Sequence, residues 1–336
     1  MSESILCLLP TNPDGSLDRV SLECLGAASA LKQKSGASLT IGCWGKAPAV
    51  GIAACGADRY CLVEGESFTD PRYATDVAAA EALLKTAGAN LVMAPATSRI
   101  QRFLPGLAAR SGGVVDTHCT GIDFADGKFT ATRWFYRQRI ETVVSRKEVR
   151  PWMISLEGGC SEAIVIGDQP SFESVDAPAV ESRTQIKTIE ATSGGDQTIR
   201  PDSDMLFVAG AGWTKKQSDG SVKTDKAAAL ILDFINRRKA SLGSSKSMVD
   251  LSSEGHAVLP FLTHLHQIGQ TGATPRHAKG LSTCCHGEEP HAVGWRFIKE
   301  RRAINLDANC GWAHGKADVL YVADAFEVME KVNAQL

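Results

Sequence analysis

The stretch Met205-Leu206-Phe207-Val208-Ala209-Gly210-Ala211-Gly212 decides the fold of the second half of the chain. Five apolar residues in a row predict a fully buried strand, and the glycines after them predict a tight turn. The helix expected next is capped by Thr224, buries a face that includes Ala227 and Phe234, and ends at Gly243. Strand, glycine turn and helix in this order favour a Rossmann-like start. Because packing alone also places glycines after strands, both interpretations stay open at this point.

Further apolar runs extend this half into a parallel sheet. The additional strands are expected at Lys246 to Leu251, Ala303 to Leu306 and Val319 to Ala323. The segment Val258 to His266 leads into a glycine-containing motif that is described below.

The first half alternates short apolar runs with helical patterns. Strands are expected at Ser4 to Leu9, Ser38 to Trp44, Arg59 to Val63 and Asn90 to Ala94, and helices at Leu17 to Lys34, Thr75 to Ala87 and Ser98 to Arg110. This alternation predicts a parallel sheet with helices on both faces. Three β-rich runs then follow without a helix between them, and we expect them to be antiparallel additions: Lys128 to Arg137, Arg139 to Ser145 and Pro151 to Glu157.

The chain of 336 residues is long enough for two domains, each with a core of its own. From Gly167 to Asp202 it is polar and rich in Ser, Thr, Gln, Asp and Pro, as a linker is. We therefore expect an N-terminal α/β domain at residues 1–167, a linker at 168–200 and a cofactor-binding domain at 201–336.

Charge and hydropathy exclude several classes of partner. The net charge is -2 and there is no long basic run, which argues against nucleic acid. The apolar run Ile5 to Leu9 is too short for a signal peptide, and no stretch reaches the length of a membrane span. We expect a cytoplasmic protein without direct membrane insertion.

The chain has ten cysteines and no CxxC pair. Most are scattered singly in apolar segments, where a thiol in a reducing compartment behaves as a small buried hydrophobe. Cys284, Cys285 and His286, with His291 and Cys310 downstream, form the one cluster that suggests metal chemistry. The usual zinc spacings are absent from it, and adjacent cysteines rarely fill two corners of one tetrahedron, so we predict no metal site.

The motif Gln267-Ile268-Gly269-Gln270-Thr271-Gly272 points to a cofactor. Its glycines carry no Cβ, which lets the backbone approach a planar ligand closely. Its amides and hydroxyl can face heterocycle edges and phosphate oxygens. With His291, Asn305 and Asp324 further along the chain, the motif predicts a dinucleotide-type site in the C-terminal third.

Four motifs in order give the chain a resemblance to the alpha subunit of electron-transfer flavoproteins over nearly its whole length. They are Gln267 to Gly272, Gly287 to His291, Ile304-Asn305-Leu306-Asp307 and Val322-Ala323-Asp324, and the segment Leu242 to Lys246 matches a further family motif. The first domain matches more loosely, through Ala94 to Thr97 and the strand beginning at Arg150. The resemblance implies an α/β fold of two domains: a nucleotide-hydrolase-like parallel sheet with antiparallel additions, then a Rossmann-like FAD-binding domain.

The resemblance also implies the cofactor, FAD, and a role for the matched residues. Ser245, Asn305 and Asp324 would hold the pyrophosphate and the adenosine half. The segment Ile268 to Thr271 would line the isoalloxazine, with the Thr271 hydroxyl near N5, and His291 would lie by the pyrimidine carbonyl. The implied cofactor-binding set is Ser245, Lys246, Gln267, Ile268, Gly269, Gln270, Thr271, His286, Gly287, Glu288, His291, Asn305, Asp324 and Ala325. No catalytic acid, base or nucleophile is required, because the flavin carries the electrons.

The chain departs from the family pattern at three places. The turn Gly210 to Trp213 lacks the family's arginine, and Trp213 beside it can either stack on the cofactor or pack in the core. Lys246 replaces a strand arginine, which keeps the charge and loses the planar stacking surface. Glu288 and Glu289 stand where neutral side chains are expected, and if they face the ring they disfavour the anionic reduced flavin. We therefore predict a flavin potential below the family norm.

Three functional interpretations follow. The first is an electron carrier that pairs with a beta subunit as a heterodimer, accepts electrons from a flavin-dependent dehydrogenase and passes them to a respiratory-chain acceptor, a quinone reductase. The second is a flavin-free structural subunit of a dehydrogenase complex, suggested by the missing arginine. The third is a stand-alone dehydrogenase, which the lack of a convincing acid–base pair disfavours.

Overall fold

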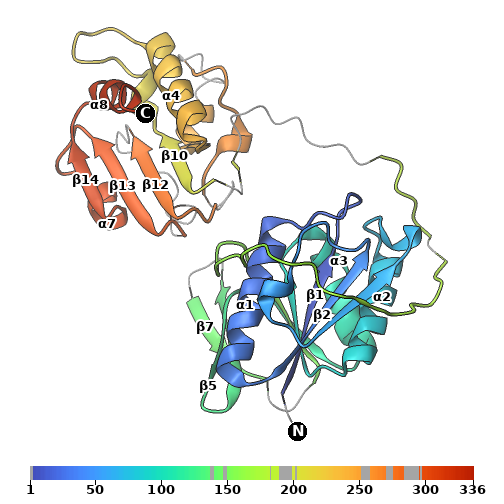
Figure 1. Ribbon diagram of the computed structural model, residues 1–336. Coiled ribbons are helices and arrows are strands. Elements are labelled where there is room, and N and C mark those ends of the chain that lie inside the picture. The colour runs from blue at the N-terminus through green and yellow to red at the C-terminus, as the bar shows by residue number, and fades with distance from the viewer. Residues whose placement is uncertain are drawn as a thin grey trace. The chain divides into compact units, whose positions relative to one another are not determined.

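The chain folds into two compact units, Met1–Ile189 and Glu190–Leu336, each with its own sheet (Figure 1). The computed structural model describes residues 3–136, 140–146, 150–181, 183–188, 199–200, 203–250, 258–269, 275–283, 295 and 297–336. The α/β class and the two-domain architecture predicted from the sequence are confirmed.

The first unit is built on a nine-stranded sheet in the order β7-β6-β5-β8-β4-β1-β2-β3-β9. Its strands are β1 (Ser4–Pro10), β2 (Ser38–Gly45), β3 (Arg59–Glu64), β4 (Leu91–Pro95), β5 (Val114–Ala125), β6 (Lys128–Phe135), β7 (Ile140–Val144), β8 (Trp152–Leu156) and β9 (Glu173–Ser174). Its helices are α1 (Arg19–Ser35), α2 (Tyr73–Ala87) and α3 (Ser98–Arg110), with 3-10 turns η1 (Ala53–Cys55) and η2 (Glu66–Phe68).

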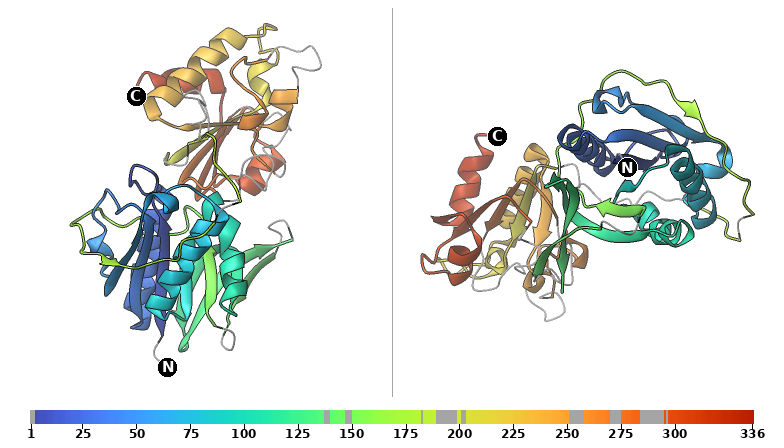
Figure 2. Two further views of the ribbon diagram at one scale, coloured as in Figure 1. Left: turned by 90° about the vertical axis from the view of Figure 1, so that its right-hand side faces the viewer. Right: turned by 90° about the horizontal axis from the view of Figure 1, so that it is seen from below.

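Helices cover both faces of this sheet, as the alternation of elements predicted (Figure 2). Successive side chains of a strand point to opposite faces. Ile5, Cys7 and Leu9 of β1 therefore join the core under α1, whereas Leu6 and Leu8 join the core under α2 and α3. Six cysteines of this unit are buried among apolar side chains, and burial raises the pKa of Cys119, for example, to about 12. Such thiols stay protonated and act as small apolar groups.

One of the three runs expected as antiparallel additions was predicted wrongly. β6 pairs antiparallel with β5 and β7, as expected. β8 instead lies between β4 and β5 and is parallel to both. All five residues of β8 are buried, which fits a central strand with helices on both faces and does not fit an edge addition. β5, a mostly half-exposed strand, was not predicted at all.

The first part of the segment expected as a linker is bound to the first unit. The backbone N–H of Gly167 donates to the carbonyl of Gly51, and that of Ala53 donates to the carbonyl of Asp168, at 3.0 and 3.1 Å. β9 then pairs parallel with β3. A Cβ at Gly51 would come within 1.9 Å of the Gly167 carbonyl, so this crossing depends on a glycine.

The second unit has a fully parallel sheet in the order β11-β10-β12-β13-β14. The strands are β10 (Met205–Ala209), β11 (Ser241–Ser244), β12 (Lys279–Thr283), β13 (Glu300–Asn305) and β14 (Val319–Val322). Its described helices are α4 (Thr224–Arg238), α5 (Lys246–Asp250), α7 (Gly311–Lys316) and α8 (Ala325–Asn333), with 3-10 turns η3 (Ala211–Thr214) and η5 (His264–His266). α4 and α8 pack over one face, where Phe207, Phe234 and Phe326 share a core.

Around β11 the sequence prediction was wrong in two respects. The helix does not run to Gly243, because α4 ends at Arg238 and the next residue, Lys239, adopts the left-handed conformation that ends many helices. The strand is Ser241–Ser244, and the run beginning at Lys246 is helix α5. Gly243 belongs to the strand, where a Cβ would lie 2.5 Å from Ile268 Cγ1. β12 was also missed.

Candidate functional site at the carboxyl edge of the second sheet

The strand order of the second unit fixes where a ligand can bind. The chain leaves β10 for β11 on one side and later crosses to β12 on the other side. In open parallel sheets the crevice outside the carboxyl ends of two such strands is the usual binding place. All five strands are parallel, so the loops after β10, β11, β13 and β14 reach the same edge.

The turn after β10 packs into the core at this edge. Trp213 is fully buried, and its Nε1 donates to Thr283 Oγ1 at 2.8 Å. Its ring lies against that of Phe326, with the ring centroids 4.6 Å apart. Of the two roles left open by the sequence, Trp213 therefore takes packing. The neighbouring Ala211 and Gly212 are also buried.

A shallow pocket lies between this turn and the ends of β13 and β14. Its lining consists of Gly212, Gln217, Ile304, Asn305, Leu306, Ala323, Asp324, Ala325 and Phe326. Three of the predicted cofactor residues thus come together: Asn305 meets the adjacent pair Asp324 and Ala325, although the sequence separates it from them by about twenty positions. Gln217 was not predicted, because it belongs to no motif.

The polar groups of the pocket are held by their own backbone surroundings. Oδ1 of Asp324 accepts hydrogen bonds from the N–H groups of Phe326 and Glu327, at 2.7 and 3.3 Å, and so caps α8. Oδ1 of Asn305 accepts the N–H of Asp307 at 3.0 Å. A fixed carboxylate beside a fixed carboxamide is suited to bind hydroxyl and amino groups, and it disfavours phosphate at the same spot.

The predicted residues around Ser245 form a second group at the end of β11. Gln267 pairs with Ser244 in an isolated bridge, and the N–H of Ile268 donates to the Ser244 carbonyl at 3.0 Å. Ser245 is buried, and its N–H donates to the carbonyl of Ala209 at 3.0 Å. Gly269 has a φ of 141°, a conformation that needs glycine. These contacts bring Ser245, Gln267, Ile268 and Gly269 to the loop after β10.

Ser244 is the side chain of this group that the sequence did not single out. It is fully buried, and its Oγ has no hydrogen-bond partner among the described residues. A buried hydroxyl without a partner is costly, and a ligand atom at this edge would relieve that cost. Lys246 stands next in the chain with its side chain mostly exposed and paired with Asp250 at 3.7 Å.

Six of the predicted cofactor residues lie outside the described residues: Gln270, Thr271, His286, Gly287, Glu288 and His291. Their roles at the flavin ring stay predictions, as does that of Glu289. The cluster of Cys284, Cys285 and His286 lies outside as well. In the described part of the chain, no group of three or more His, Cys, Asp or Glu side chains is placed to hold a metal ion.

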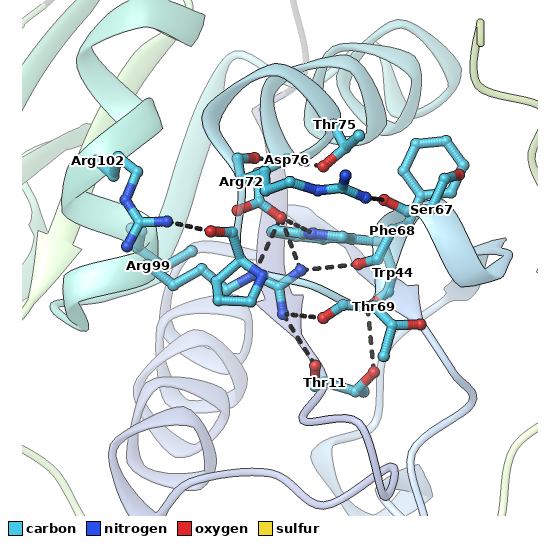
Figure 3. Close-up of polar contacts among 12 residues, drawn as sticks. Thr11, Trp44, Ser67, Phe68, Thr69, Arg72, Thr75, Asp76, Arg99 and Arg102 are labelled. Carbon is cyan, nitrogen blue, oxygen red and sulfur yellow. Dashed lines mark hydrogen bonds and ion pairs between the residues drawn. The ribbon is translucent and has the colours of Figure 1, made fainter. Parts of the chain in front are cut away.

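The carboxyl edge of the first sheet is arranged differently (Figure 3). The strand order changes direction at β1, whose neighbours are β2 and β4. Arg99 lies in the first turn of α3, which follows β4. It donates to the carbonyl of Thr11, just after β1, at 3.1 Å. Its other N–H groups donate to the carbonyls of Phe68 and Thr69 at 2.8 and 3.2 Å and to Oδ1 of Asp76 at 2.7 and 3.0 Å. The chain's own guanidinium therefore fills this edge.

Asp76 is the counter-ion of this arrangement and is fully buried. Its Oδ1 also accepts the indole N–H of Trp44 at 2.8 Å, whereas its Oδ2 has no partner in the described part of the chain. Burial raises the pKa of Asp76, and the hydrogen bonds from Arg99 oppose that rise. Sequence reasoning did not find this pair, since an Asp in one helix and an Arg in another carry no motif.

With these two edges described, the chain can be compared with known proteins. The family model for the electron transfer flavoprotein domain matches residues 5–192. The chain belongs to the electron transfer flavoprotein family. Over nearly its full length it is similar to alpha subunits of that family. It is 24% identical to "Electron transfer flavoprotein subunit alpha" of Methylophilus methylotrophus over 330 residues, which is 94% of each chain.

Two further relatives match this chain over nearly its full length. The alpha subunit of Syntrophomonas wolfei is 24% identical over 96% of each chain. "Protein FixB" of Clostridium saccharobutylicum is 22% identical over 96% of this chain and 93% of its own length. The family likeness predicted from the four motifs is confirmed, and electron transfer is the function of this family. Among the helices that the structure describes, none is long and apolar enough to cross a membrane.

Proposed function

We propose that this electron transfer flavoprotein binds FAD in its second unit and acts as the alpha subunit of a heterodimer with a beta subunit. It accepts electrons from a flavin-dependent dehydrogenase and delivers them to a quinone reductase of the respiratory chain. FAD, when bound, supplies the redox chemistry by accepting and releasing the electrons. The protein's part is to hold the cofactor and to exclude water from it.

The observation that carries this proposal is the convergence of family-motif residues on one edge of one sheet. Asn305, Asp324 and Ala325 line a single pocket. Ser245 follows β11, and Gln267 pairs with Ser244 at the end of that strand, at the same edge of the sheet. The buried Oγ of Ser244, which has no hydrogen-bond partner among the described residues, supplies a further polar group. A dinucleotide, with hydroxyls at one end and phosphates in its middle, matches this donor and acceptor set.

The charge of each side chain suggests which part of FAD it contacts. The Asp324 carboxylate accepts hydrogen bonds from ribose hydroxyls and repels phosphate by its charge, while the Asn305 amide adds a second polar contact. The hydroxyls of Ser244 and Ser245, next to the ammonium of Lys246, suit the pyrophosphate. Ile268 to Thr271, together with His291, remain the proposed contacts of the flavin ring.

The test is the flavin content of the heterodimer, purified after co-expression with its beta subunit. Asp324→Asn is the most informative variant, because Asn caps helices as well as Asp does and therefore removes the charge while keeping α8. Hydrogen bonds to charged groups contribute about 1.5–3 kcal/mol, so the Kd for FAD should rise roughly 10- to 100-fold. Asp233→Asn, which removes an exposed carboxylate paired with Arg237 on α4, is the matched control and should leave the Kd unchanged.

The same experiment decides between the carrier and the flavin-free structural subunit. The buried Trp213 turn, which has no arginine, is the observation that favours a flavin-free role. A colourless heterodimer that added FAD cannot reconstitute would refute the carrier proposal. A yellow heterodimer whose flavin is reduced by a dehydrogenase and reoxidised by a quinone reductase supports it.

A further inference from the structure

We infer that Trp213 is a positioning residue of the pocket between Gly212 and Asp324, and that it holds the two walls of the binding site for the adenosine half at a fixed separation. This inference rests on the proposed binding of FAD. Trp213 is not among the residues that line the pocket, so it acts through the residues it touches.

The first wall is the turn after β10, and the indole N–H ties it to β12. Nε1 of Trp213 donates to Thr283 Oγ1 at 2.8 Å, and that hydroxyl donates in turn to the carbonyl of Val208 at 3.1 Å. The N–H of Gly210 donates to the Thr283 carbonyl at 2.8 Å. These bonds join the ends of two neighbouring strands, and Gly212, which lines the pocket, is directly attached to them.

The second wall is the start of α8, and the indole ring supports it. Phe326 lines the pocket and packs on Trp213 with the ring planes inclined by 60°. Its N–H is donated to Oδ1 of Asp324, the carboxylate proposed to accept the ribose hydroxyls. A shift of Phe326 toward a smaller partner would move this N–H and the carboxylate together.

This arrangement gives Trp213 a function at the place where the family arginine is missing. An arginine in this turn would bring a positive charge to the edge of the pocket. A buried tryptophan instead makes the turn rigid and fixes its distance from Asp324, because both its ring and its N–H are fully engaged. A pocket held in its binding geometry loses less conformational entropy when a ligand enters.

The test uses the heterodimer with four substitutions in this chain. Trp213→Phe retains a ring against Phe326 and removes the N–H, and Thr283→Val removes the acceptor at nearly constant shape. Each should raise the Kd for FAD about two- to tenfold, the range that corresponds to one net hydrogen bond. Thr283→Ser retains the hydroxyl and should behave as the wild type. Trp295→Phe is the matched control: it removes a buried indole N–H bonded at 2.9 Å to the Lys316 carbonyl, outside the pocket.

The readouts separate positioning from general stability. In Trp213→Phe the visible spectrum and the midpoint potential of the bound flavin should match the wild type, because only the adenosine half loses its support. An unchanged Kd in both Trp213→Phe and Thr283→Val overturns the inference. So does a rise in Kd of equal size in Trp295→Phe, or a shifted flavin potential in Trp213→Phe. If the wild-type heterodimer itself binds no FAD, the proposed function fails, and this inference fails with it.

Discussion

Replacing Arg99 with Met should destabilise the first unit more than any exposed substitution. The guanidinium is the counter-ion of Asp76, whose side chain is 0% exposed, and it also serves three backbone carbonyls. Removing one partner of a buried ion pair leaves an uncompensated charge and costs about 3–5 kcal/mol. The loss is a large fraction of a typical domain stability of about 5–15 kcal/mol.

The substitution also makes stability depend on pH in a stated direction. Burial raises the pKa of Asp76, and without Arg99 nothing opposes that rise as strongly. A carboxyl whose folded pKa lies above its unfolded pKa contributes stability at low pH that is lost as the pH rises between the two values. The deficit of Arg99→Met relative to the wild type should therefore be larger at pH 8 than at pH 5.

The assay is urea unfolding of the full chain at both pH values, followed by tryptophan fluorescence. Six tryptophans contribute to this signal, and Trp44, which donates its indole N–H to Asp76, is one of the three in the first unit. Urea is used because a guanidinium ion can enter the vacated site. The double variant Arg99→Met with Asp76→Asn removes both charges and retains an acceptor for Trp44, so it should recover part of the loss. A cost below about 1 kcal/mol for Arg99→Met, the value for a surface pair, would refute the reasoning.

Three further predictions follow from single sites. Asp116→Asn should destabilise the first unit at neutral pH and lose this effect in acid. Burial raises the pKa of Asp116, but the hydrogen bonds from Arg146 and Trp152 outweigh burial, and the net pKa is lowered. The stability that the carboxylate contributes therefore disappears as the pH falls. Gly243→Ala should cost about 1–3 kcal/mol, because its Cβ would lie 2.5 Å from Ile268 Cγ1. Glu288→Gln combined with Glu289→Gln should raise the flavin potential in a spectroelectrochemical titration.

The Asp116 and Gly243 variants each have a control in the same chain. Asp123→Asn removes a carboxylate that is 55% exposed and paired with Lys34, and its effect on stability should be small at any pH because solvent screens the pair. Gly311→Ala adds a Cβ where no atom lies within 4 Å and should be tolerated. A potential that falls or stays constant in the double Glu variant would contradict the proposed influence of those carboxylates on the ring.

Local sequence determined those elements whose own pattern is unambiguous. α3 was predicted to run to Arg110 with Ser98 as its cap, because its apolar side chains recur at helical spacing; the helix is Ser98–Arg110, and the cap is Thr97, one residue earlier. The buried run 205–209 became β10. The sequence also placed Asn305 and Asp324 together in the predicted cofactor site. Asn305 and Asp324 do meet in one pocket.

The remaining features depend on contacts between distant segments, which no local pattern encodes. β8 was expected as an antiparallel addition, but it lies inside the sheet. Its two parallel partners, β4 and β5, come from earlier in the chain. Arg99 and Asp76 belong to two helices and pair only when the ends of β1 and β4 are side by side.

In the second unit, Trp213 likewise shows what the sequence left open and the tertiary structure decided. Its place beside a glycine turn allowed either stacking on a cofactor or packing, and only its hydrogen bond to Thr283, 70 residues away, decided for packing. The sequence by itself determined which family this chain belongs to and which chemical groups its site contains. The tertiary structure decided which of those groups meet, because burial and hydrogen-bond partners are set by the assembled sheet and not by neighbours in the chain.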